Sequence, residues 1–375
     1  MQIQEVKTPS DLNRFVSFPW QIYRDDPQWV PPLILEQKET LNPKKHPFYL
    51  HGTAAKFLLL NGNETLGRIL VADDPRYNEE NKSNIGTFGF FECVNDNEAA
   101  QKLLAAAAEW SQKHGRTKLM GPMEYSTNYS CGMLVDGFDT SPRMMMPHNP
   151  PYYNDLLVNA GLVKNKDLYA WWFHDPYDIV QKWTPFIDRI GNRYNVIIRP
   201  FSKKKFKEDV ERCLKVYDAV RSDWWWSCVS LTKAEVDYFA KNLALIGNEN
   251  LVYIAEHEGE PIGFSITMPD LNEAIKPFNG KLTWYGLPIN LIRLYRNMKR
   301  VKTARMMVLC VLPKFQKRGV AERLIMNTLD YGKNNVRFTG AELSWTDEGN
   351  DKINRVIERV GAVKYKTYRV YEREN

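Results

Sequence analysis

A segment of small and basic residues between an apolar run and a helical pattern is the sharpest chemical feature of the sequence. The segment reads Gln316-Lys317-Arg318-Gly319-Val320-Ala321, and it follows Val311-Leu312-Pro313 at the end of the apolar run. Backbone N–H groups at the start of a helix have no partner within the helix, so they favour an anion there. The small residues allow close backbone approach, and the two basic side chains add charge. The segment therefore predicts a cradle for phosphate groups.

The elements that must position this cradle follow from the periodicity around it. Helices are predicted to end at glycine and strands at proline, as the backbone chemistry of those residues requires. The predicted elements of this half are a strand over 195–201, helices over 204–220 and 233–245, a hairpin over 251–268, a strand over 303–312, a helix over 319–334, a strand over 340–345, a helix over 351–360 and a strand over 364–372. Their order predicts an α/β fold with a mixed sheet.

The chain contains one internal repeat. A hairpin pattern around Gly67 recurs around Gly263, and a helix end followed by a strand around Gly161 recurs around Gly361, at a nearly equal offset. Two similar offsets indicate two copies of one αβ unit, with chance similarity of short apolar runs as the alternative. The length of 375 residues also favours two cores.

We therefore expect two tandem domains. The predicted boundaries are an N-terminal unit over 1–180, a linker over 181–194 and a C-terminal unit over 195–375. Within residues 1–50, the prolines between Arg24 and Leu33 exclude regular structure there. The aromatic residues of the same stretch predict an ordered, extended segment packed on the first unit.

The cradle resembles the acetyl-CoA-binding motif of the GNAT superfamily of N-acyltransferases, in which Gln/Arg-x-x-Gly-x-Gly/Ala follows a strand ending in Val-x-Pro. A second family element, an Asn and a helix with Gly eleven residues later, is matched by Asn350 and Gly361. The resemblance covers roughly residues 195–375. It implies two tandem GNAT-like domains, and the stretches 121–128 and 144–153 also resemble a little-characterised bacterial group of two-unit GNAT-like proteins.

The resemblance implies a cofactor, acetyl-CoA or another acyl-CoA. In the family the fourth and fifth strands separate, and pantetheine binds between them to the backbone of the residue that matches Val311. The implied cofactor-binding residues are Val311, Gln316, Lys317, Arg318, Gly319, Val320, Ala321 and Asn350. The first unit departs from this pattern, because 92–100 holds three acids and no Gly-rich or basic loop. We expect that unit to bind no cofactor and to shape the substrate site or the interface instead.

Acyl transfer to an amine needs a base for the proton and benefits from an acid for the leaving thiolate. Asp270 is the predicted base and Asn272 would orient the amine, although Pro-Asp-x-Asn is also a common turn and cap composition. Glu342 and Asp347 are the alternative bases. Family members often carry an acidic Tyr where this chain has Ile357, so Tyr368 is the predicted substitute, with Tyr371 of the same strand as the alternative.

Composition and charge limit the remaining classes of function. The five cysteines are scattered and unpaired in sequence, and the six histidines show no metal spacing, so neither disulfides nor a metal site is predicted. A formal charge of +6 suits an anionic ligand but does not by itself indicate nucleic acid. No sequence run is apolar and long enough to cross a bilayer. We expect a cytoplasmic protein without a membrane partner.

The predicted function is transfer of an acyl group, with acetyl as the first candidate, from acyl-CoA to an unidentified amine on a small molecule or a peptide. Two alternatives stay open: an aminoacyl transferase that uses aminoacyl-tRNA, and a non-catalytic interaction protein. Nucleic acid is expected as a partner only in the first alternative. An intact phosphate cradle favours the enzyme, because an interaction module has no use for one. The sequence does not indicate the oligomeric state.

Overall fold

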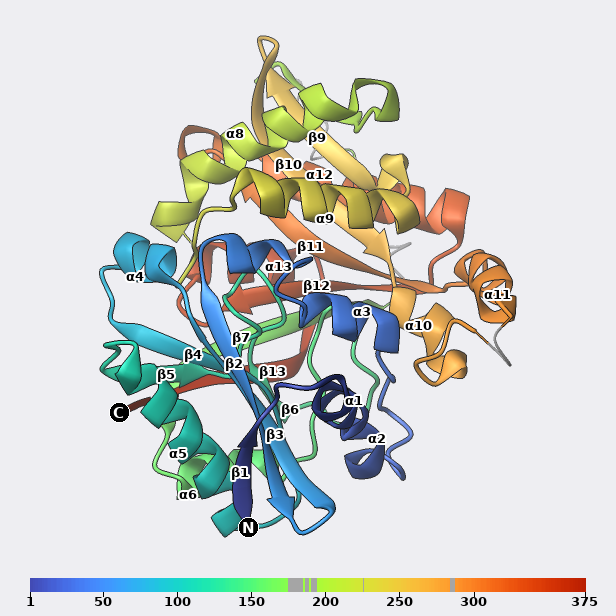
Figure 1. Ribbon diagram of the computed structural model, residues 1–375. Coiled ribbons are helices and arrows are strands. Elements are labelled where there is room, and N and C mark those ends of the chain that lie inside the picture. The colour runs from blue at the N-terminus through green and yellow to red at the C-terminus, as the bar shows by residue number, and fades with distance from the viewer. Residues whose placement is uncertain (175–184, 186–188, 190–193, 225, 284–286) are drawn as a thin grey trace.

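The computed structural model describes residues 1–174, 185, 189, 194–224, 226–283 and 287–375. These residues form one continuous mixed sheet with helices on both faces (Figure 1). The strand order is β1-β2-β3-β4-β5-β13-β7-β12-β11-β10-β9-β8, and β6 pairs with β13 beside this path. The mixed α/β fold predicted from the sequence is confirmed.

The elements of the first half share the lower part of Figure 1. Its strands are β1 (Gln2–Glu5), β2 (Thr53–Asn61), β3 (Glu64–Asp73), β4 (Ile85–Cys93), β5 (Lys118–Gly121), β6 (Met133–Asp136) and β7 (Val163–His174). Its α-helices are α1 (Pro9–Ser17), α2 (Pro19–Ile22), α3 (Ile34–Thr40), α4 (Pro75–Asn81), α5 (Asn97–Lys113) and α6 (Tyr153–Asn159), with a 3-10 turn η1 (Pro47–Leu50).

The elements of the second half follow the sequence predictions to within a few residues, except for the helices α10 (Leu271–Ile275) and α11 (Ile289–Met298), which have no predicted counterpart. Its strands are β8 (Val196–Pro200), β9 (Val252–His257), β10 (Glu260–Pro269), β11 (Thr303–Val311), β12 (Gly340–Asp347) and β13 (Val363–Glu374). Its other helices are α8 (Phe206–Trp224), α9 (Lys233–Ile246), α12 (Val320–Tyr331) and α13 (Asp351–Arg359), with short turns η2 (Lys203–Lys205), η3 (Glu249–Leu251), η4 (Lys276–Phe278), η5 (Pro313–Phe315) and η6 (Gly332–Val336).

The repeat inferred from the sequence is present in the structure. The hairpins β2–β3 and β9–β10 occupy corresponding places in the two halves. Gly161 and Gly361 end α6 and α13 with φ of 85° and 97°, a left-handed conformation that glycine adopts at no steric cost. Each helix is then followed by the last strand of its half.

The two halves exchange these last strands at the centre of the sheet. β7 pairs antiparallel with β12 of the second half, and β13 pairs antiparallel with β5 of the first half and with β7. Neither half of the sheet is therefore complete without a strand from the other. The division into units at 180 and 195 stays a prediction, and most of the predicted linker 181–194 lies outside the described residues.

Segment 24–33 is irregular, as predicted, but it contacts both halves. Trp29 stacks on Tyr23 with ring centroids 4.9 Å apart. Val30 and Leu33 pack in one cluster with Ile275 of α10 and with Phe278. The prediction that this segment packs on the first unit is therefore incomplete, because it also covers the second half.

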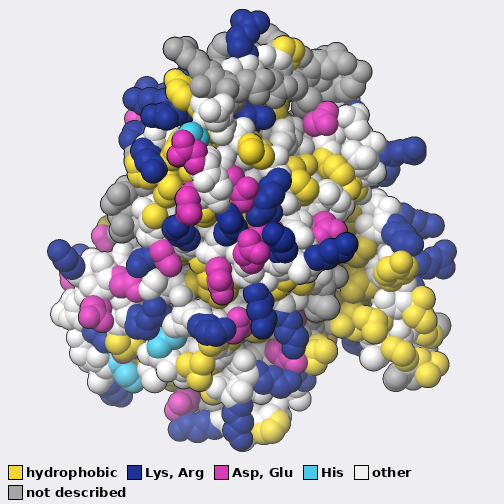
Figure 2. Space-filling model, turned by 90° about the horizontal axis from the view of Figure 1, so that it is seen from above, with side chains coloured by type: hydrophobic (Ala, Val, Ile, Leu, Met, Phe, Trp, Pro, Cys, Tyr) yellow, Lys and Arg dark blue, Asp and Glu magenta, His cyan; other side chains and the backbone are white. Residues whose placement is uncertain are grey.

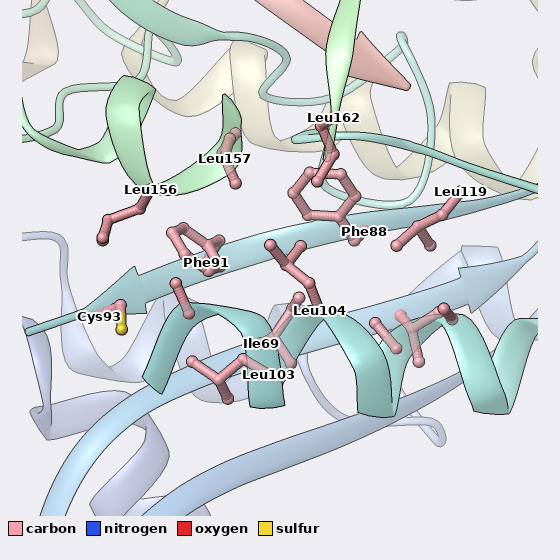
Figure 3. Close-up of a cluster of buried hydrophobic side chains, with 14 of the residues drawn as sticks. Ile69, Phe88, Phe91, Cys93, Leu103, Leu104, Leu119, Leu156, Leu157 and Leu162 are labelled. Atoms are coloured by element: carbon pink, nitrogen blue, oxygen red, sulfur yellow. The ribbon is translucent and has the colours of Figure 1, made fainter. Parts of the chain in front are cut away.

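Helices cover opposite faces of the second half of the sheet. α8 packs against Ile254, Phe264 and Cys310, whereas α12 packs against Ala255 and Val311. Successive strand residues point to opposite faces, so neighbouring residues of β9 and β11 serve the two helices. The first half has one large core between its sheet, α5 and α6, filled with aromatic and aliphatic side chains (Figure 3).

Candidate active site

Two neighbouring parallel strands of the second half separate partway along their length. β11 and β12 pair from Thr303 and Gly340 to Met306 and Leu343, and beyond these residues no pairing continues. The register of β11 against β10 also shifts there, which leaves Met307 as a bulge. A central strand is normally covered by both neighbours, so this separation opens the middle of the sheet.

A cavity of about 1510 Å³ passes through this opening. On one face its walls come from α8 and α9, and on the other from the first turns of α12 and from α13. Met307, Val308 and Leu309 line it and are only half-buried, although they belong to a central strand. A cavity of this size exceeds the roughly 300–1,000 Å³ that suits one drug-sized ligand.

The predicted phosphate cradle lies on the wall of this cavity. Gly319 is the N-cap of α12 with φ of 74°, and Lys317 also has a positive φ, of 60°. No side chain caps this helix, so the N–H groups of its first turn are left for a ligand. Gln316 donates its side-chain amide to the carbonyl oxygen of Val311 at 3.2 Å.

The structure brings most of the predicted cofactor-binding residues to the cavity. Those that line it are Val311, Gln316, Lys317, Gly319, Ala321 and Asn350. Arg318 does not line it, and its guanidinium lies over the rings of Tyr194 and Phe315 instead. Val320 is buried in the core beneath α12. The cofactor role of these residues stays a prediction.

Three cations of α13 also line the cavity, and the sequence analysis missed them. They are Lys352, Arg355 and Arg359. Their spacing of three and four residues places them on one face of the helix, which is a signal that the sequence carried. Asn350 caps this helix by accepting the N–H of Ile353 at 3.4 Å. The phosphates of a bound cofactor would thus meet positive charge from two helices.

Backbone groups of β11 face the separated edge. The N–H of Leu312 donates to Ile262 on β10 at 2.8 Å. Backbone groups alternate between the two edges of a strand, so those of Val311 and Leu309 point away from β10, toward the opening. The backbone groups of Leu309 and Val311 are therefore oriented to form hydrogen bonds with the amide or carbonyl groups of a ligand in the opening.

A buried polar network lies where the two strands separate. Arg305 donates from Nε to Ser344 Oγ at 2.7 Å, and the same Nε lies 3.4 Å from a carboxylate oxygen of Glu342. The hydroxyls of Ser344 and Tyr365 donate to Glu342. Arg305 and Ser344 line the cavity, whereas Glu342 is fully buried behind them. Burial lowers the pKa of Arg305, although Glu342 opposes this shift.

The predicted base, Asp270, has a different environment from the one expected. It caps α10, it is 1% exposed, and its carboxylate accepts from Arg143 at 3.2 Å and from the N–H of Met144 at 2.9 Å. Burial raises the pKa of Asp270 to about 6. Neither Asp270 nor Asn272, which donates to Pro142 O, lines the cavity. These contacts give Asp270 a structural role and leave its catalytic role an unsupported prediction.

Tyr368, the predicted acid, is also away from the cavity wall. It is fully buried on β13, its hydroxyl has no hydrogen-bond partner among the described residues, and burial raises its pKa well above the usual value. Ile357 and the alternative base Asp347 do line the cavity. Burial raises the pKa of Asp347.

The first half completes the cavity wall. Thr127, Asn128, Tyr129 and Met145 line it. Thr127 donates to Ser227 O at 2.7 Å, and Tyr129 and Asn128 donate to residues of the 229–235 region. The cavity therefore lies partly between the halves. Among the described residues, no helix is both long and apolar enough to span a bilayer.

Comparison with protein-family models matches residues 217–362 to the acetyltransferase (GNAT) family. Two full-length relatives are similar. One, named "Bacterial ceramide synthase", from Caulobacter vibrioides (strain NA1000 / CB15N), is 32% identical over 377 aligned residues, covering 100% of this chain and 97% of the relative. The other, "Protein YghO" from Escherichia coli (strain K12), is 30% identical and covers 97% and 93%.

A solved structure with the same overall fold is a tandem GNAT protein from the clavulanic acid biosynthesis pathway. Its TM-score is 0.55 at 12% sequence identity, with 100% of this chain and 98% of that chain covered. At this identity the likeness concerns the fold, which is that of two tandem GNAT units.

Proposed function

Because the chain belongs to the GNAT family and is an N-acyltransferase, we propose that it transfers a long acyl group from acyl-CoA to the amine of a lipid-like acceptor. The observation that carries this proposal is the apolar extension of the cavity beyond the cradle. Side chains of Phe206, Val210, Leu214, Phe239 and Leu243 form its wall between α8 and α9. An acetyl group needs no such chamber, whereas an aliphatic chain gains free energy by burial there.

The similarity to a protein named "Bacterial ceramide synthase" supports the same substrate class. A ceramide is the amide of a fatty acid and a long-chain amino alcohol. The similarity covers 100% of this chain and 97% of the relative, so the correspondence includes α8, α9 and the segments of the first half that line the cavity. We propose an amine of this class as the acceptor.

The residues around the cradle fit an acyl-CoA. The uncapped first turn of α12, Lys317, and the cations of α13 suit its phosphates. The opening between β11 and β12 suits the amide-bearing pantetheine arm, because the backbone groups of Leu309 and Val311 face it. When bound, acyl-CoA supplies an activated thioester carbonyl. The neutral amine forms a C–N bond to that carbon as the C–S bond breaks; the nitrogen gives up one proton and the leaving thiolate takes up one, so the products are an amide and the free thiol of CoA.

Glu342 is the proposed proton acceptor, acting through Ser344. The hydroxyl of Ser344 is on the cavity wall and donates to Glu342, so a proton given to Ser344 Oγ can be passed to the buried carboxylate. Arg305 holds Ser344 in this orientation at 2.7 Å. The N–H groups of Leu309 and Val311 are the proposed donors to the thioester oxygen as negative charge develops on it.

The proposal is tested by incubating the purified chain with palmitoyl-CoA and sphinganine, and by detecting the amide product by mass spectrometry and the released thiol with a thiol reagent. We expect amide and thiol in equal amounts, and a kcat/KM at least about tenfold lower with acetyl-CoA. Ser344→Ala should reduce turnover and leave acyl-CoA affinity unchanged. Turnover of acetyl-CoA alone would overturn the long-chain assignment, and transfer only from aminoacyl-tRNA would overturn the donor.

A further inference from the structure

Helix α11 lies at the outer edge of the second half (Figure 1), and it presents an apolar face to solvent. Leu287, Leu291, Ile292 and Tyr295 form this face, and they are 59%, 55%, 66% and 66% exposed. Their spacing of four, one and three residues places them on one side of a helix and its N-terminal approach. So many large apolar side chains on one short element are costly in water unless they have a partner.

The helix is held in this orientation by its other side. Leu294 and Met298 pack in a cluster with Ala274 and Val301. Asn290 donates to Lys281 O at 2.7 Å, and Asn297 donates to Ala274 O at 3.0 Å. Because the inner face is already packed, α11 cannot turn its apolar face into the core without breaking these contacts.

The charge of this stretch of the chain is of one sign. Between Glu273 and Glu322 the sequence contains no acidic residue. The exposed cations beside the apolar face are Lys281, Arg293, Arg296, Lys299 and Arg300. Glu273 is itself engaged, since it accepts the N–H of Lys302 at 2.8 Å and the hydroxyl of Thr303. The surface is therefore cationic as well as apolar.

Seen from above, hydrophobic side chains gather at the edge of the molecule where Figure 1 places α10 and α11, with Lys and Arg side chains beside them (Figure 2). Other parts of the same view mix charges of both signs. An apolar stripe bordered by Lys and Arg is the pattern of a helix that lies in a membrane interface. Long basic side chains bury their stems beside the stripe and keep their charge at the headgroups.

We propose that α11 docks this protein to the surface of a bilayer that contains anionic lipids. The apolar face enters the boundary between headgroups and acyl chains, and the surrounding cations pair with the anionic headgroups. This contact is peripheral and needs no spanning helix. It departs from the sequence-based expectation of no membrane partner, which considered only segments long enough to cross the bilayer.

The packed side of α11, opposite its apolar face, lies near one end of the cavity. Leu251 packs in the same cluster as Leu294 and Met298 of α11, and its neighbours Glu249 and Val252 line the cavity. A bilayer held at α11 would therefore be separated from this end of the cavity by the helix and the cluster beneath it. The docking proposal itself rests on the surface of α11 and does not depend on the proposed reaction.

The test is flotation of the full-length chain with two kinds of vesicle. One kind contains phosphatidylcholine alone, and the other also contains about 30% phosphatidylglycerol, which supplies the anionic headgroups. We expect the chain to float with the anionic vesicles and to be released by high salt. Leu291→Ser combined with Ile292→Ser should lower the partition coefficient at least about tenfold, because two apolar side chains no longer enter the interface.

The matched control is Ile197→Ser combined with Val363→Ser, whose side chains are 65% and 66% exposed but lie on β8 and β13. It should float like the wild type. Equal flotation of the α11 variant, or no flotation of the wild type with anionic vesicles, would overturn the proposal. A wild-type dimer that the α11 variant converts to a monomer in light scattering would assign the face to a second copy instead. Acyl-CoA binding, measured without vesicles, should be unchanged in every variant, so failure of docking is distinguishable from failure of the proposed function.

Discussion

In each half of the molecule a helix follows the fourth strand, but the N-termini of the two helices are capped differently. In the first half, the carboxylate of Asp96 accepts the N–H groups of Glu98 and Ala99 at 2.8 and 3.1 Å, and so caps α5. In the second half Gly319 stands at the N-cap of α12 and offers no side chain. The first helix therefore carries its own anion, whereas the second leaves room for a ligand's phosphate.

The strands beside these helices also differ between the halves in the room that they leave for a ligand. Pairing of β4 with β5 ends at Thr87 and Met120, much as pairing of β11 with β12 ends at Met306 and Leu343. In the first half the two segments stay in contact beyond this point, because the N–H of Met123 donates to Phe88 O at 2.7 Å, whereas in the second half a cavity lies there. Two copies of one topology thus differ as ligand sites through a cap and through the contact that continues beyond the paired strands.

Giving α12 the cap of α5 should have the largest effect. Gly319→Asp places a carboxylate where the phosphate is expected, and we predict that acyl-CoA affinity falls about a hundredfold or more in calorimetric titration. Gly319→Asn is the matched control, because Asn has the same size, tolerates a positive φ as Asp does and carries no charge. Equal losses in the two variants would show that space, not charge, distinguishes the halves.

Replacing the proposed base should affect turnover and not binding. Glu342→Gln keeps the shape of the side chain, and we expect kcat to fall about 10²- to 10³-fold with acyl-CoA affinity unchanged. Asp270→Asn, which changes a carboxylate outside the cavity wall, should lower kcat less than tenfold. If Asp270→Asn is the slower enzyme, the base predicted from sequence is right and Glu342 is not the base. Thermal melting checks that both variants are folded.

Filling the chamber should make the second half resemble the packed first half. Ala240 of α9 lines the cavity, and Ala240→Trp should lower kcat/KM for palmitoyl-CoA about tenfold while acetyl-CoA turnover changes little. Ala219→Trp places the same side chain on an exposed position of α8 outside the cavity wall and should leave both rates unchanged. A uniform loss for both donors in Ala240→Trp would contradict a chain-binding role for the chamber.

The contact between the halves should depend on pH through His51. Burial opposes its charge, but a hydrogen bond between Nδ1 and Asp74 at 3.3 Å and an ion pair between Nε2 and Glu235 of α9 at 3.5 Å raise its pKa from 6.5 to about 9. The stabilisation is therefore complete below pH 6.5 and is lost as the pH rises to about 9. We expect a loss of about 2 kcal/mol in unfolding free energy over that window. Denaturant titrations of His51→Gln should show no such loss between these pH values. A loss equal to that of the wild type would refute the role of His51.

Removing the cap of the first half should have the smallest effect. Asp96→Ala should lower the free energy of unfolding by about 1 kcal/mol, the usual contribution of an N-cap, in a denaturant titration. We also expect the first half to bind no acyl-CoA even without its cap. Calorimetry of the double variant Asp96→Ala and Gly319→Asp tests this, because the second substitution blocks the site in the second half. If that double variant binds acyl-CoA, the cap alone accounts for the difference in ligand binding between the two halves.

The cradle and the catalytic residues differ in how far a local sequence pattern can place them. The small and basic loop after an apolar strand is a local pattern, so Gln316 to Ala321 could be placed without tertiary information. Asp270 follows a strand that leads toward the cleft, which favours it as the base, but a carboxylate at that point is equally typical of a helix cap. Asp270 accepts a hydrogen bond from Arg143, which is more than a hundred residues away in the chain, and a local sequence pattern cannot predict such a contact.

The sequence by itself determined the two αβ units, their helices and strands, and the uncapped glycine that opens α12, because periodicity and residue type act over short distances. Only the tertiary structure decided that β7 and β13 exchange between the halves, that Glu342 meets Arg305 and Ser344 where two strands separate, and that Tyr129 of the first half closes the cavity. These arrangements depend on packing between residues far apart in the chain, which no local pattern records.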